Sequence, residues 1–268
     1  MGQIKTGCST ACLYPMEAER ALSALLAFDC KYLELFINCR WEIEKGFLRE
    51  LRRQGEAIGA RFTSVHPYTS MVEGMLLFGD YPRRTKEGFA LYRQYLEGAA
   101  VLGAPYVVIH GTMVPGNSPG RGWSEERYFR RMGALYDMGL EIGAVPAQEN
   151  VVNHLSGTPD FIRRMRASLG DRCAFVLDLK QCRRAGVTVS EMLDAMGDRL
   201  VHIHLSDFSE EEKKDCLLPG QGEMDLSALR NCLEARDYRG TMVTEVYRDC
   251  FSDAEELKRS YDFVKTVF

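Results

Sequence analysis

The sequence predicts a (β/α)8 barrel, a closed ring of eight parallel strands surrounded by helices. Short apolar runs of strand type alternate with longer amphipathic stretches of helical type along the whole chain. Eight such units in 268 residues match the usual size of this barrel. An open, doubly wound sheet is the alternative, but it usually has fewer strands, and no Gly-x-Gly-x-x-Gly motif follows the first run.

The eight expected strands, in chain order, are residues 4–8, 32–36, 62–66, 106–110, 146–150, 175–178, 201–204 and 241–246. Amphipathic stretches between them include residues 18–28, 44–59, 86–103 and 127–143. Several of these end in Gly, which is typical of a helix C-terminus. Strands that alternate with helices imply right-handed crossovers and a parallel sheet. No Pro/Ser-rich linker divides the chain, so we expect one domain over residues 1–268.

Composition and charge narrow the function classes. The chain is 46% hydrophobic and 27% charged, with a net charge of -4, and this mild acidity argues against general nucleic-acid binding. No apolar run approaches the roughly 18 residues that span a membrane, and the N-terminus lacks the pattern of a signal peptide. The nine cysteines are odd in number and form no C-x-x-C pair, which favours reduced thiols. We therefore expect a cytoplasmic protein without nucleic-acid or membrane partners.

Polar side chains end six of the expected strands. In barrels of this kind the C-terminal ends of the strands carry the active site. The last inward positions of the third to eighth runs hold three histidines and three carboxylates, namely His66, His110, Glu149, Asp178, His204 and Glu245. These side chains are therefore expected to meet in one mouth of the barrel.

The three carboxylates predict a bound cation. Converging carboxylates repel one another and are costly to desolvate without a positive partner. One divalent ion held by Glu149, Asp178, His204 and Glu245 would supply that charge, and this donor set suits Mn²⁺, Mg²⁺, Co²⁺ or Zn²⁺. A carboxylate–histidine network without metal is the alternative.

The stretch LVHIHLSD at residues 200–207 places two imidazoles on one strand face, because side chains alternate along a strand. His204 lies in the layer of the other expected ligands. His202 lies one layer deeper, where the neighbouring strands carry small or medium side chains, so we expect it either to support the site or to pack in the core, and not to bind metal. Glu34 faces inward on the second strand and is assigned the same supporting role.

Six motifs, YLELF, AQEN, VLDLKQ, HIHLSD, PGQGEMD and VTEV, are spread over essentially the whole chain. Through them the chain resembles the xylose-isomerase-like barrel superfamily, which includes ketose 3-epimerases, inosose dehydratases and endonuclease IV. In the epimerase branch the matching positions hold one catalytic metal ion. The resemblance therefore implies Glu149, Asp178, His204 and Glu245 as ligands.

Departures from the family pattern narrow the range of expected functions. The family commonly has D-x-x-H after the sixth strand, where this chain has glutamine at Gln181, which can hydrogen-bond a substrate hydroxyl. The later D-x-H element of the endonuclease is absent, so two ligands of its zinc cluster are missing and DNA repair is not expected. His66 and His110, which match zinc-binding positions of the endonuclease, are expected to contact substrate instead. The arginine that some ketose epimerases place after the seventh strand is also absent.

The chemistry expected of this site is proton transfer next to a carbonyl. A cation that polarises adjacent carbonyl and hydroxyl oxygens would stabilise an enediolate, with Glu149 and Glu245 as base and acid. The leading hypothesis is a metal-dependent sugar or polyol isomerase or epimerase. A lyase of the inosose or dehydroshikimate type is the first alternative, and a non-catalytic binding subunit is the second.

Two further residues are assigned to substrate. Trp123 follows the Gly/Pro-rich loop VPGNSPGRGW and either covers the mouth of the barrel or anchors that loop. Lys180 could meet an acidic or phosphorylated group, but no usual barrel phosphate site is evident, which favours an unphosphorylated substrate. Barrels of this kind often assemble, so we expect a homo-oligomer, either a dimer or a tetramer.

Overall fold

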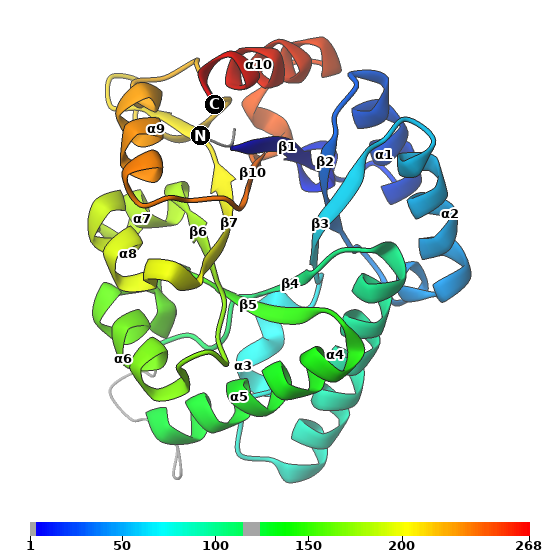
Figure 1. Ribbon diagram of the computed structural model, residues 1–268, viewed down its shortest axis with the longest axis vertical. Coiled ribbons are helices and arrows are strands. Elements are labelled where there is room, and N and C mark those ends of the chain that lie inside the picture. The colour runs from blue at the N-terminus through cyan, green and yellow to red at the C-terminus, as the bar shows by residue number, and fades with distance from the viewer. Residues whose placement is uncertain (1–3, 115–123) are drawn as a thin grey trace.

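The computed structural model describes residues 4–114 and 124–268. Eight parallel strands close into a barrel in the order β1-β10-β7-β6-β5-β4-β3-β2, which confirms the predicted fold (Figure 1). The barrel strands are β1 (Lys5–Ser9), β2 (Tyr32–Phe36), β3 (Arg61–His66), β4 (Tyr106–Ile109), β5 (Val145–Glu149), β6 (Phe175–Asp178), β7 (Leu200–Leu205) and β10 (Thr241–Thr244). Each lies within two residues of its expected bounds.

Helices surround this barrel on its outer side (Figure 1). They are α1 (Ala18–Ala27), α2 (Lys45–Glu56), α3 (Glu73–Leu76), α4 (Pro82–Leu102), α5 (Glu125–Ile142), α6 (Pro159–Leu169), α7 (Leu179–Ala185), α8 (Val189–Met196), α9 (Leu226–Ala235) and α10 (Ala254–Val267). Helices α4 and α5 end at Gly103 and Gly143, whose φ angles are 84° and 98°. Glycine suits both positions because it adopts positive φ without steric cost.

The barrel interior is packed beneath its C-terminal mouth. Val108, Ala147, Ala174 and Val176 form a separate buried apolar cluster inside the ring of strands. His202 lies in register with Val176 of β6 and is fully buried. These small side chains leave the space that an imidazole needs below the mouth.

No helix in the two described stretches has the length and apolar character that crossing a lipid bilayer requires.

A β-hairpin that the sequence does not predict follows β7. Strands β8 (Asp207–Ser209) and β9 (Lys214–Leu217) pair antiparallel outside the barrel. The buried carboxylate of Asp207 accepts hydrogen bonds from the backbone N–H groups of Phe208, Gly220, Gly222 and Met224. These bonds explain why HIHLSD and PGQGEMD occur together: the last residue of the first motif holds the loop that contains the second.

Candidate active site

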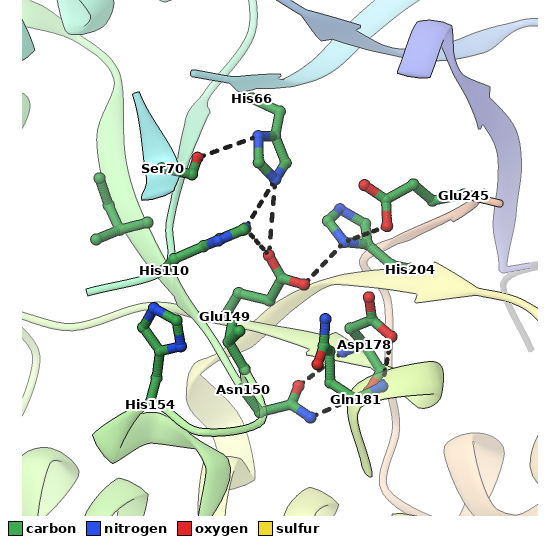
Figure 2. Close-up of polar contacts among 12 residues, drawn as sticks. His66, Ser70, His110, Glu149, Asn150, His154, Asp178, Gln181, His204 and Glu245 are labelled. Atoms are coloured by element: carbon green, nitrogen blue, oxygen red, sulfur yellow. Dashed lines mark hydrogen bonds and ion pairs between the residues drawn. The ribbon is translucent and has the colours of Figure 1, made fainter. Parts of the chain in front are cut away.

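A cavity of about 420 Å³ lies at the C-terminal ends of the strands. It is lined by His66, His110, Glu149, Asp178, Lys180, Gln181 and Glu245, all predicted site residues, together with aromatic side chains that include Tyr14, Phe36, Tyr68 and Tyr247. Figure 2 shows how the polar members converge from different strands. Trp123 lies outside the described residues. A larger cavity of about 690 Å³ lies at the N-terminal ends of the strands, but its described lining holds one carboxylate, Glu56, and no histidine.

Glu149, the last residue of β5, lies between the His66–His110 pair on one side and His204 on the other. Its Oε2 lies 3.0 Å from His110 Nε2 and 3.7 Å from His66 Nε2. Its Oε1 lies 3.6 Å from His204 Nδ1 on the other side (Figure 2). Burial alone would raise the pKa of Glu149, but the neighbouring histidines, His110 foremost, hold it well below its usual range. Glu149 is therefore a carboxylate at neutral pH.

His204 is oriented from below by Glu34 of β2. The Glu34 Oε2 atom lies 3.0 Å from His204 Nε2 and accepts a 2.7 Å hydrogen bond from Ser64 Oγ. With Nε2 engaged, His204 Nδ1 faces Glu245 Oε2 at 3.4 Å and Glu149 Oε1 at 3.6 Å. This Nδ1 atom is buried and has no hydrogen-bond partner within the described chain. Burial opposes the charge of His204, but Glu245 and Glu34 hold its pKa well above the usual value, so Nδ1 can hold either a proton or a metal ion beside these carboxylates.

His202 lies deeper than His204, as its place on the strand predicts. Its Nε2 lies 3.1 Å from Ser64 Oγ and 3.4 Å from Glu34 Oε2, and the side chain is fully buried. It is in the same network as Glu34 but does not line the cavity. The structure thus brings Glu34 and His202 together beneath the site.

Asp178 ends β6 and starts α7. Its Oδ1 accepts a hydrogen bond from the backbone N–H of Gln181, which caps the helix. Asn150 fixes the same turn, because its side-chain oxygen accepts from Asp178 N at 2.7 Å and its amide donates to Asp178 O at 3.0 Å. Burial raises the pKa of Asp178 to about 6, against the opposing effect of Lys180.

Lys180 lies between two of the predicted ligands. Its Nζ atom is 2.8 Å from Asp178 Oδ2 and 3.2 Å from Glu245 Oε2. Burial opposes its charge, but these two carboxylates hold the pKa of Lys180 well above its usual value. Gln181 Oε1 accepts from Val152 N at 3.1 Å, so this side chain is tied to the loop after β5.

Three groups of described residues have donor atoms close enough to share an ion. One holds three of the four predicted ligands, Glu149, Asp178 and His204; the others are His66–His110–Glu149 and Glu34–His202–His204. Glu245, the fourth predicted ligand, contacts the first group through His204. Sequence reasoning did not foresee the second group, in which the Nε2 atoms of His66 and His110 lie 3.1 Å apart. The available signal was that His66, His110 and Glu149 end consecutive strands.

Glu73 is a buried carboxyl group that sequence reasoning missed. It lies in the short helix α3, accepts a 2.6 Å hydrogen bond from Tyr92 and another of 2.6 Å from the backbone N–H of Gly111. Gly111 follows His110 and has a φ of 86°, so Glu73 fixes the turn that carries His110 into the site. Burial raises the pKa of Glu73 to about 7.

This raised pKa predicts a pH-dependent stability. Because the folded-state pKa of about 7 exceeds the ordinary value of 4.5, the contribution of Glu73 is fully present below pH 4.5 and is lost as pH rises through 7. Glu73→Gln cannot ionise. From pH 5 to pH 8 it should gain about 2.5 kcal/mol in free energy of unfolding relative to the unsubstituted protein. Urea denaturation at both pH values measures this gain, and an unchanged difference would contradict the prediction.

The fold and the polar mouth define a class of parallel barrels with a buried cluster of carboxylates and imidazoles, a candidate metal site, at the C-terminal ends of their strands. Residues 22–267 match the xylose isomerase-like TIM barrel family, and the chain belongs to this family. An uncharacterized protein of Mycobacterium leprae is 26% identical over 288 residues, covering 98% of this chain and 97% of that protein. An uncharacterized protein of Mycobacterium tuberculosis is 24% identical over 282 residues, with 98% and 97% coverage.

Solved structures with the same fold include sugar epimerases. The 3-keto-D-glucoside 4-epimerase of E. coli superposes with a TM-score of 0.73 at 17% identity, over 98% of this chain and 100% of the epimerase. D-psicose 3-epimerase of Clostridium cellulolyticum, solved with D-tagatose, gives 0.79 at 14% identity, with 98% and 99% coverage. D-allulose 3-epimerase of Methylomonas sp., in complex with D-allulose, gives 0.79 at 16% identity, with 100% and 98% coverage.

Proposed function

We propose that this protein is a metal-dependent isomerase or epimerase that acts on a small sugar or polyol through an enediolate. One observation carries the proposal. The buried Nδ1 atom of His204 has no hydrogen-bond partner in the described chain, and carboxylate oxygens of Glu149 and Glu245 lie 3.6 and 3.4 Å from it. Asp178 places a further carboxylate within reach of the same point.

The donor set fits one divalent cation. Glu149, Asp178, His204 and Glu245 would hold it, and three carboxylates with one imidazole suit Mn²⁺, Mg²⁺, Co²⁺ or Zn²⁺. Such an ion would supply positive charge to the substrate oxygens on which negative charge develops. The Glu34–His204 contact is the outer support that metal-ligating histidines usually have.

The side chains around this donor set have separate tasks. Glu149 and Glu245 approach His204 from different strands, so one removes the proton beside the carbonyl while the other returns it. His110 and His66 keep Glu149 ionised and line the cavity beside it. Gln181 and Lys180 also line the cavity, where they can bind substrate hydroxyl groups. The structural neighbours that bind D-tagatose and D-allulose support the sugar class.

Deuterium exchange tests this proposal. In heavy water with Mn²⁺, the purified protein should incorporate deuterium at the carbon beside the carbonyl of a ketose or keto-polyol, and NMR should show the epimer or isomer. Prior chelation should abolish both signals, and added metal should restore them, because the cation would stabilise the negative charge that develops on the substrate oxygens. Exchange that survives complete chelation contradicts the proposal. A product lighter by about 18 Da would instead show the loss of water, as in the lyase alternative.

A further inference from the structure

The Lys180 side chain contacts two carboxylates, Asp178 and Glu245, that the proposed function assigns as ligands of the cation. It leaves the first turn of α7 and is only 5% exposed. Its Nζ atom lies 2.8 Å from Asp178 Oδ2 and 3.2 Å from Glu245 Oε2. Glu245 Oε2 is also the oxygen that lies 3.4 Å from His204 Nδ1. One carboxylate oxygen therefore contacts both the ammonium group and the proposed metal-ligating imidazole.

The surroundings keep this ammonium group in place. The ring of Tyr247 lies 5.5 Å from Lys180 Nζ, and the Tyr247 hydroxyl accepts a 2.8 Å hydrogen bond from Arg184. Arg184 is in turn paired with Asp215. A lysine ammonium group has no free lone pair, so Lys180 cannot bind the metal ion as a further ligand. Its effect on an ion held by the same oxygens is electrostatic.

We propose that Lys180 is a built-in counter-cation, which holds Asp178 and Glu245 together before a divalent ion binds and then weakens the binding of that ion. Both effects follow from charge. Without a cation, Asp178 and Glu245 would repel each other in a buried mouth. With a divalent ion on the same oxygens, the ammonium group is a like charge only a few ångströms away, in surroundings that screen poorly. The inference rests on the proposed metal site and concerns its affinity.

Lys180→Met tests the proposal because methionine keeps an unbranched side chain and removes the charge. In chelator-treated protein titrated with Mn²⁺ by calorimetry, the variant should bind the ion roughly tenfold tighter than the unsubstituted protein. In the metal-free state it should melt several degrees lower, because the carboxylates of buried Asp178 and half-buried Glu245 lose their partner. Lys180→Arg keeps the charge and should remain close to the unsubstituted protein in both measurements.

Arg183→Met is the matched control, because it removes a positive charge from the same helix but from a side chain paired with Glu210. It should change the Mn²⁺ affinity about twofold or less, since this partly exposed charge is better screened. Equal or weaker Mn²⁺ binding by Lys180→Met overturns the inference. If only the Lys180→Met variant binds Mn²⁺, the counter-cation is supported while metal-dependent function of the natural protein fails. If neither the unsubstituted protein nor Lys180→Met binds Mn²⁺, the melting temperatures of the metal-free proteins decide. A lower melting temperature in Lys180→Met but not in Lys180→Arg supports the counter-cation role, and equal melting temperatures overturn it.

Discussion

Replacing Glu149 by glutamine is expected to lower the rate of substrate proton exchange by about 10⁴-fold, measured as deuterium incorporation at saturating Mn²⁺. The carboxylate uses both oxygens: Oε2 lies 3.0 Å from His110 Nε2, and Oε1 lies 3.6 Å from His204 Nδ1. An amide has only one acceptor oxygen, so its NH₂ group must face one of these sites. The variant thus loses the proposed base and one proposed metal ligand while keeping the side-chain volume.

Two measurements make this result specific to Glu149. Glu141→Gln, on the exposed side of α5, is the matched control and should retain full exchange activity. A melting temperature of Glu149→Gln close to that of the unsubstituted protein would exclude misfolding as the cause of the loss. If Glu149→Gln keeps more than about a tenth of the exchange rate, Glu149 is not the base. If the unsubstituted protein binds a sugar without any exchange, the alternative of a binding subunit is favoured.

The barrel could be predicted from the sequence because its signals are local. Alternation along each short run determines which side chains face inward, and glycines such as Gly103 and Gly143 mark where helices end. The same alternation places Glu149, Asp178 and His204 at one end of the barrel, where their donor atoms do meet. The hairpin of β8 and β9 cannot be predicted in this way, since its polar strands have no apolar alternation and depend on Asp207 for their geometry.

The contacts that refine the site come from residues distant in the chain. Glu34, 170 positions earlier in the chain, determines which nitrogen of His204 faces the mouth. The residue pattern of neither strand predicts this contact. Lys180 reaches Glu245 only because α7 begins directly after Asp178, so its first turn lies over the mouth. Glu73 lies in a four-residue helix within the segment between β3 and α4, where periodicity carries no information about burial.

Glu34 connects these distant residues into one network. Its Oε2 accepts from Ser64 and lies 3.0 Å from His204 Nε2 and 3.4 Å from His202 Nε2. Burial alone would raise the pKa of Glu34, but His204 and His202 hold it well below its usual range. A carboxylate in this position accepts from Nε2–H, which turns Nδ1 of His204 toward the mouth. Burial opposes the charge of His204, but Glu245 and Glu34 hold its pKa well above the usual value, so a metal ion would bind at Nδ1 in place of a proton.

Glu34→Gln is therefore expected to weaken Mn²⁺ binding 10- to 100-fold, roughly the effect known for outer partners of metal-ligating histidines. Glutamine keeps the volume but removes the charge that favours Nε2–H, so His204 no longer presents Nδ1 reliably. Calorimetric titration of chelator-treated protein measures the change. Glu42→Gln, another buried carboxylate whose Oε2 accepts from Asn38 N, is the control and should leave the affinity unchanged. Equal Mn²⁺ affinity in Glu34→Gln and Glu42→Gln would mean that His204 is oriented without Glu34, or that it is not a ligand.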